Sequence, residues 1–238
     1  WKRPKFDFVN FLYNSYRLKL SPKLYITSRY ILKFVNLFNY FFKNLNDGIY
    51  IDVGCYHPFN GNNTKLLCDK GWSGINIDLD FHTIDFFNFI RPRDENIQTA
   101  ISDIDGERDM YFFHNRSAIN SLSSHKKQKP KEIKKIQTKT LNSIIENSKF
   151  KNKKINLLCI DVEGHEVEVI KGFDLKKYSP QMMVIEFIDY NMTNIEFHNQ
   201  SIETILSSNI YKHMIENNYN FVNWLHSDLI FVNKKVRT

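Results

Sequence analysis

The sequence predicts an α/β protein built on a doubly wound, Rossmann-like sheet with helices on both faces. Three observations predict this fold. Short apolar runs alternate with stretches of helical periodicity along most of the chain. Several of these runs stop at a glycine or an acidic residue, as strands of an open α/β sheet do where they meet a ligand. Two final apolar runs close the chain and predict a β-hairpin.

Residues 48–80 show the alternation most clearly. An apolar run at 49–53 ends in Asp-Val-Gly, a loop leads to a helical stretch at 63–70, and a second apolar run at 74–78 ends at an acid. A helix at 82–90 follows, and Arg91-Pro92 ends it because proline cannot continue a helix. We expect a third strand at 97–101, a turn at Asp105-Gly106 and a strand at 108–113.

The second half of the chain continues the pattern after a polar segment. Residues 114–137 are rich in serine and lysine and predict a loop. Thr140 is suited to cap a short helix that runs to Glu146. A strand at 156–161 then leads to a helix at 164–171, a strand at 182–187 to a helix at 201–216, and runs at 220–225 and 229–232 form the closing hairpin.

Residues 1–46 differ from the rest and predict a separate helical segment. Aromatic and aliphatic residues recur there at helical spacings in two groups, and Ser21-Pro22 separates the groups. We therefore expect two amphipathic helices at 1–46 and a main domain at 47–238. The helices would pack as a cap on that domain, and either a lid over an acceptor site or a dimer face is compatible with a cap.

The composition limits which binding partners and which cellular compartment are expected. No run of 18 apolar residues exists, so a membrane span is not expected. The three cysteines lack the spacing of a disulfide framework or a zinc site, which favours a reducing cytoplasm. The net charge of +7 is concentrated in two lysine-rich segments, 126–139 and 149–154. Such segments attract an anionic acceptor or a membrane surface, but a solvated loop is the commoner explanation, and nucleic acid is not expected.

The unit at 48–80 predicts a nucleoside site without a pyrophosphate. Gly54 stands alone after the first strand, whereas a dinucleotide site requires the G-x-G-x-x-G pattern. Asp78 ends the second strand, where an acid accepts the ribose hydroxyls. Asp80 competes for this role. A ligand with a ribose and no phosphate fits, and S-adenosylmethionine is the common one. An ordinary α/β turn without a ligand is the alternative.

Together with that unit, the later stretches INLLCIDVEGHEVEVIKG (155–172) and PQMMVIEF (180–187) resemble the FkbM-type methyltransferase family over about residues 48–232. The segments Gly71–Asp78 and Asp161–Gly164, with Glu166, carry most of this resemblance. It implies a class I methyltransferase sheet that ends in an antiparallel hairpin, and S-adenosylmethionine as cofactor. The cofactor contacts it implies lie at Asp52, Gly54, His57, Asn63, Thr64, Asp78, Ile101 and Ser102. Thr64 and Asn63 are equally suited to cap a helix, and His57 to shape a turn.

Methyl transfer to oxygen requires an aligned acceptor and a group that takes one proton. Asp161 ends the fourth strand and is the first candidate for that base, with His165 as the second because histidine titrates near neutrality. Glu163 is expected to bind backbone N–H groups at the start of the next helix. Asp161 and Glu186 would point into one crevice, where a pair of carboxylates can hold Mg²⁺.

We therefore expect an S-adenosylmethionine-dependent O-methyltransferase that acts on a hydroxyl of a saccharide, such as a capsular or lipopolysaccharide sugar, or of a related metabolite. One alternative is an NAD-dependent sugar-modifying enzyme, which the absence of G-x-G-x-x-G disfavours. The other is a non-catalytic glycan-binding or membrane-surface protein on a degenerate methyltransferase fold, which an intact Asp78 disfavours.

Overall fold

The computed structural model describes residues 36–59, 61–112, 129–188, 201–225 and 227–236. The chain divides into two compact units, Trp1–Leu45 and Asn46–Thr238. In the first unit, residues 36–42 form a helix within the second of the two predicted helices. The first predicted helix and the Ser21-Pro22 break lie outside the described residues, so the role of this segment as a cap or lid stays a prediction.

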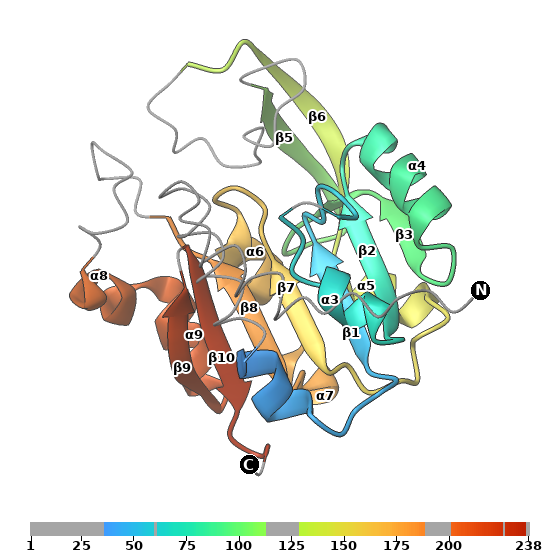
Figure 1. The fold of residues 1–238 in the computed structure, drawn as a ribbon. Coiled ribbons are helices and arrows are strands. Elements are labelled where there is room, and N and C mark those ends of the chain that lie inside the picture. The colour runs from blue at the N-terminus through green and yellow to red at the C-terminus, as the bar shows by residue number, and fades with distance from the viewer. Residues whose placement is uncertain (1–35, 60, 113–128, 189–200, 226, 237–238) are drawn as a thin grey trace, which may run out of the picture. The chain divides into compact units, whose positions relative to one another are not determined.

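The second unit is organised around a seven-stranded sheet of order β3-β2-β1-β7-β8-β10-β9, and helices cover both of its faces (Figure 1). The strands are β1 (Ile49–Val53), β2 (Ser73–Asp78), β3 (Glu95–Gln98), β7 (Leu157–Ile160), β8 (Met182–Glu186), β9 (Tyr219–Leu225) and β10 (Asp228–Asn233). The helices are α3 (Lys65–Asp69), α4 (Phe81–Ile90), α5 (Leu141–Asn147), α6 (Glu166–Lys171), α7 (Leu175–Tyr178), α8 (Ile202–Ser207) and α9 (Asn209–Glu216).

The direction of strand addition reverses at β1, which has β2 on one side and β7 on the other, both parallel to it. Carboxyl ends of parallel strands meet at one edge, and ligands of open α/β sheets bind where the strand order reverses. β10 runs antiparallel between β8 and β9. The predicted doubly wound fold with a closing hairpin is therefore confirmed.

A uniformly apolar core explains why these strands form where the sequence predicts them. Every residue of β1, β7, β8 and β10 is buried. Alternate side chains of these strands, those on one face of the sheet, belong to one hydrophobic cluster that also takes in α5, α6 and α9. Near-continuous apolar runs are typical of parallel strands covered on both faces. The core thus fixes the strand ends that carry the acidic residues.

The predicted strand at 97–101 is wrong as a single element. β3 pairs with β2 only as far as Gln98, opposite Asp78, and Ala100–Ile101 forms a separate short strand, β4. β4 joins a second sheet of order β4-β6-β5, with β5 at Gly106–Phe112 and β6 at Glu132–Lys139. The Thr99 backbone N–H still bonds to the Asp78 carbonyl of β2, at 3.0 Å, and the chain enters the second sheet directly after it.

The loop prediction for 114–137 is also wrong where the structure describes that segment. β6 pairs antiparallel with the whole of β5, from Glu132 opposite Phe112 to Thr138 opposite Gly106. The two project as an arm from the main sheet (Figure 1). Most β6 residues are exposed and polar on both faces, so the strand shows little of the two-residue hydrophobic alternation that predicts strands. Residues 113–128 lie outside the described part.

The predicted helix at 201–216 is two helices, α8 and α9. Ser208 between them has extended backbone angles, and its hydroxyl caps α9 by accepting from the Tyr211 N–H at 3.1 Å. Ser201 caps α8 in the same way. Helix α7 was not predicted; Asp174 caps it by accepting from two backbone N–H groups.

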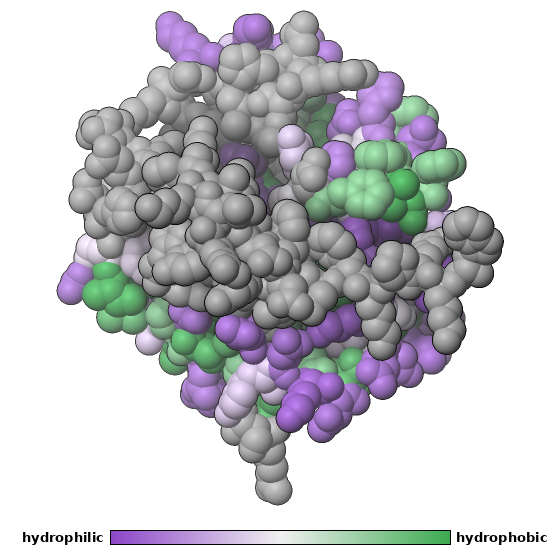
Figure 2. Space-filling view, viewed as in Figure 1, coloured by the Kyte–Doolittle hydropathy of each residue, from purple (hydrophilic) through white to green (hydrophobic). Residues whose placement is uncertain are grey.

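The outer face of α4 exposes the aromatic side chains of Phe81, Phe86 and Phe89. Figure 2 shows the resulting apolar patch over this helix, on the right of the view. Phe86 and Phe59 are in edge-to-face contact, with ring centroids 6.0 Å apart. Within the described residues, helices are too short or too polar to cross a bilayer.

Candidate functional site

The candidate site begins at Gly54, directly after β1. Its backbone is left-handed, with φ of +78°, and its N–H donates to the Ile77 carbonyl at 2.9 Å. A Cβ atom at this position would lie 1.7 Å from the Asp161 carbonyl oxygen. The glycine is thus required by the approach of the β7 end to the β1 end. The predicted contact of Gly54 with the cofactor stays a prediction.

Asp78 is the last residue of β2, which lies next to β1 on the side away from β7. Its two carboxylate oxygens accept from the backbone N–H groups of Tyr56 and Asp80, each at 2.9 Å. Burial raises the pKa of this carboxyl, although the backbone hydrogen bonds oppose that shift. A carboxylate oxygen has two acceptor positions, so each oxygen keeps one after these contacts. The two remaining acceptor positions therefore fit a ligand that donates from two hydroxyl groups, as a ribose does.

Asp80, which the sequence offers as a competitor for the ribose role, has a structural contact of its own. It is the N-cap of α4, and its carboxylate accepts from the Thr83 N–H at 2.9 Å. N-capping by aspartate is a common structural use of this residue. The capping role of Asp80 favours Asp78 as the ribose acid, and this assignment stays a prediction.

Asp52 and Thr64, both predicted as cofactor contacts, belong to a buried network under the 55–64 loop. The Asp52 carboxylate accepts from the Thr64 hydroxyl and from the Asn62 amide, each at 2.9 Å. Arg91 donates to the Thr64 hydroxyl at 2.8 Å and to the Asn62 and Pro58 oxygens at 2.7 Å each. Arg91 also lies over the Phe87 ring. These contacts shape the loop that follows Gly54, and a cofactor contact by Asp52 or Thr64 stays a prediction.

His57 and Asn63 lie in the same loop and are half-buried. The His57 Nδ1 atom accepts from the Phe59 N–H at 3.1 Å, and its ring packs edge-on against Phe86 with centroids 5.3 Å apart. This geometry matches a turn-shaping role for His57. A cofactor contact by either residue stays a prediction.

Three further residues predicted for the site, Ile101, Ser102 and His165, are buried in the structure. Ser102 is fully buried, and its hydroxyl lies 2.9 Å from His165 Nε2. Ile101 and His165 are buried as well. Burial lowers the pKa of His165. The pair connects the end of β4 to the start of α6, and this placement gives His165 little access to an acceptor.

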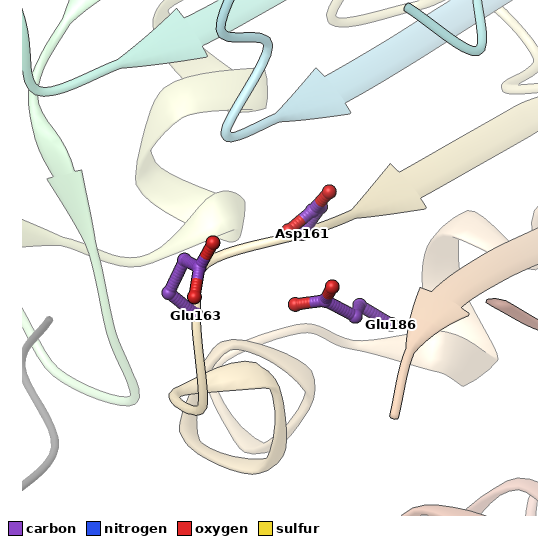
Figure 3. A group of neighbouring side chains, drawn as sticks. All are labelled: Asp161, Glu163 and Glu186. Carbon is purple, nitrogen blue, oxygen red and sulfur yellow. The ribbon is translucent and has the colours of Figure 1, made fainter. Parts of the chain in front are cut away.

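Three carboxylates converge at the ends of β7 and β8. Asp161 follows β7, Glu163 comes two residues later, and Glu186 is the last residue of β8. One oxygen of each lies within 4.8 Å of the others. Figure 3 shows the three side chains around a common space. Asp161 and Glu186 therefore lie close together as predicted, and Glu163 joins them.

Charge crowding governs the electrostatics of this cluster. Burial, and then the neighbouring acids, raise the pKa of Glu186 well above its ordinary range. Burial is also the main reason that the pKa of Asp161 is raised. A hydrogen bond with the Glu186 carboxyl opposes this shift, whereas Asp228, Glu163 and Glu166 add to it. Like charges held together in a partly dry site favour the uptake of a proton or of a cation. The cluster is thus suited to take a proton from an acceptor or to hold a positive ion.

Glu166 makes the kind of backbone contacts that the sequence suggested for Glu163. The buried Glu166 carboxylate accepts from the N–H groups of Val162 and Gly164, at 3.1 and 2.9 Å, and so holds the loop before α6. Glu163 has a left-handed backbone with φ of +57°, which is uncommon for a residue other than glycine. That conformation places Glu163 in the carboxylate cluster.

The sheet order and the strand-end site define a class I methyltransferase domain. The sequence matches the family model of the Methyltransferase FkbM domain over residues 52–220. The chain therefore belongs to the FkbM methyltransferase family, and it is an enzyme whose expected methyl donor is S-adenosylmethionine. A comparison with curated proteins finds no match.

Among solved structures, the chain is similar to one described as the 16S rRNA methylase ArmA. The TM-score is 0.39 and the sequences are 9% identical, with 95% of this chain and 96% of that chain covered.

Proposed function

We propose that this methyltransferase transfers a methyl group from S-adenosylmethionine to a hydroxyl of a saccharide or a related small metabolite. One observation carries the proposal: Asp78 and the Asp161 cluster flank Gly54 at one edge of the sheet, because β1 lies between β2 and β7. Adjacent strands are about 4.8 Å apart, so the two sites are about two strand spacings from one another. A ligand lying across the end of β1 would have its ribose at Asp78 and its reacting end at Asp161.

The reaction needs little more than alignment and removal of one proton. S-adenosylmethionine supplies an activated methyl group on a sulfonium. The acceptor oxygen forms a bond to the methyl carbon, the carbon–sulfur bond breaks with its electron pair staying on sulfur, and the hydroxyl proton passes to a base. Asp161 is the carboxylate best placed for that base, since it lies at the solvent-accessible side of the cluster. General-base catalysis contributes typically about 10²–10⁴-fold.

Other features support parts of this proposal. All three cysteines are free, and Cys55 and Cys159 are buried, which suits a reducing cytoplasm. An anionic acceptor attracted by the lysine-rich arm is less well supported. Lys134, Lys135 and Lys139 each lie within 4.0 Å of an acid on or beside the arm. These pairs reduce the local charge and favour a solvated surface over a membrane or nucleic-acid contact.

Ligand binding and product analysis test the proposal. We expect S-adenosylhomocysteine to raise the melting temperature and to bind in calorimetry, whereas NAD does neither. With labelled S-adenosylmethionine, we expect the label in a base-stable ether of a sugar hydroxyl. Binding of NAD alone would instead support a sugar-modifying dehydrogenase or epimerase. Cofactor binding without transfer to any of a broad panel of saccharides would overturn the saccharide assignment.

The ribose assignment gives a first testable prediction. Asp78→Ala removes a charged acceptor for two hydroxyls, and this loss costs about 1.5–3 kcal/mol, or about tenfold to over a hundredfold in affinity for S-adenosylhomocysteine. Asp80→Ala is the matched control, since loss of a helix cap costs about 1 kcal/mol of stability and no ribose contact. Calorimetry on both variants measures the difference. Equal affinity in the Asp78→Ala and Asp80→Ala proteins would remove the assignment.

A further inference from the structure

The carboxylate cluster has a property beyond the uptake of a proton. Asp161, Glu163 and Glu186 offer one oxygen each within 4.8 Å of one another. The register that pairs Ile160 with Ile185 aligns the ends of β7 and β8, so Asp161 and Glu186 follow adjacent positions of the sheet. Three oxygen ligands on this scale are compatible with a cation bound between them, because hard divalent cations bind carboxylate oxygens at about 2.0–2.6 Å.

An independent observation at Glu186 points to a ligand. The Glu186 residue is only 9% exposed. In the part of the chain that the structure describes, its buried Oε2 atom has no hydrogen-bond partner. Buried polar atoms without a partner are rare and costly, at about 1–3 kcal/mol or more for a charged group. Figure 3 shows the Glu186 carboxylate directed toward Asp161 and Glu163.

The ion pairs of the described residues leave two of the three carboxylates without a basic partner. No lysine or arginine among the described residues forms an ion pair with Asp161 or Glu186. Two further acids, Glu166 and Asp228, are buried nearby and act electrostatically on Asp161. Acidic groups with this density lower the free energy of a bound cation, although the chain as a whole carries a net charge of +7.

We propose that Asp161, Glu163 and Glu186 bind one divalent cation of the Mg²⁺ or Mn²⁺ type. The ligand set is carboxylate only, which disfavours zinc and other metals that prefer nitrogen or sulfur. A magnesium-type ion keeps several coordination positions for water, and these can be exchanged for acceptor oxygens. When bound, the ion would lower the pKa of an acceptor hydroxyl. This last role rests on the proposed function, whereas the binding itself does not.

The same acids suit a second cation, the ammonium or sulfonium group of the cofactor, and the experiment must separate the two. The full chain, freed of metal with a chelator, is titrated with Mn²⁺ in calorimetry and by electron paramagnetic resonance, without cofactor. We expect one saturable site. Glu163→Gln and Glu186→Gln should each weaken it by about tenfold or more. Glu168→Gln is the matched control, because Glu168 lies in the first turn of α6 and is not a member of the carboxylate cluster.

S-adenosylmethionine and S-adenosylhomocysteine are titrated into the same metal-free variants. Their affinities should stay within about twofold of the wild-type value if the acids hold the metal ion. Absence of saturable Mn²⁺ binding below about 1 mM, or binding that survives both substitutions, overturns the proposal. So does a selective loss of S-adenosylmethionine affinity in both variants without Mn²⁺ binding, since the acids then serve the sulfonium. Absence of cofactor binding in the wild-type protein would count against the proposed function. The Mn²⁺ titration would still test the metal site, because it is done without cofactor. Melting curves verify folding, and half-buried Glu163 provides the milder variant.

Discussion

Asp161→Asn should lower the turnover number by about 10²–10⁴-fold, the usual cost of losing a general base. Asparagine keeps the shape of the side chain and removes its charge, so it can neither take a proton nor act as a strong cation ligand. Affinity for S-adenosylhomocysteine should barely change, because the ribose contact is at Asp78, two strands away. Single-turnover kinetics and calorimetry on the same preparation measure the two quantities separately.

Two comparisons make the Asp161→Asn result specific. Asp161→Glu keeps the charge and moves it by one methylene, so it should retain more activity than Asp161→Asn. Activity that a chelator removes and Mg²⁺ restores indicates a cation ligand, whereas a simple base is indifferent to both treatments. Near-normal turnover in Asp161→Asn would exclude both roles. The search would then turn to His57, since His165 is buried against Ser102.

The strands that carry the site were predictable because their burial is uniform. β1, β2, β7 and β8 are apolar runs that end at a glycine or an acid, and the structure places their ends within one or two residues of the predicted positions. Asp78, Asp161 and Glu186 follow from that pattern, since the carboxyl ends of parallel strands share one edge. The polar strand β6 was not predictable in this way, because most of its residues are exposed and show little hydrophobic alternation.

The roles of several site residues depend on contacts that no local pattern reveals. Asp52 and Thr64 are joined to Arg91, which is 27 residues beyond Thr64, and Ser102 to His165, which is 63 residues further on. Hydrogen bonds between such distant residues are set by how the helices pack on the sheet. Sequence reasoning therefore placed these residues near the site without revealing their contacts in the loop and the core, and their contacts with the cofactor stay predictions.

Glu163 was missed as a member of the carboxylate cluster for a different reason. The D-V-E-G stretch before a helix predicts acids that bind backbone N–H groups, and Glu166 makes those bonds. What directs Glu163 elsewhere is two consecutive left-handed residues, Glu163 and Gly164. The glycine after an acid was a signal for such a turn, because glycine adopts positive φ without steric cost.

Gly54→Ala should be the most damaging small substitution at the site. Alanine at a left-handed position costs about 1–2 kcal/mol. The new Cβ would also lie 1.7 Å from the Asp161 carbonyl oxygen, so the β1 and β7 ends must separate. Overpacking of this kind adds about 1–3 kcal/mol, for a total of about 2–5 kcal/mol in the free energy of unfolding. The displaced backbone belongs to Asp161, so turnover should fall as well.

Gly61→Ala is the matched control for this substitution. Gly61 has a similar left-handed backbone, with φ of +62°, but a Cβ there meets nothing within 4 Å. It should therefore lose only the backbone contribution of about 1–2 kcal/mol and keep normal turnover. Denaturant unfolding and kinetics at a temperature where both variants are folded measure the contrast. Equal losses of stability in the two variants would mean that the β1 and β7 ends tolerate separation, and that Gly54 matters only for its own backbone angle.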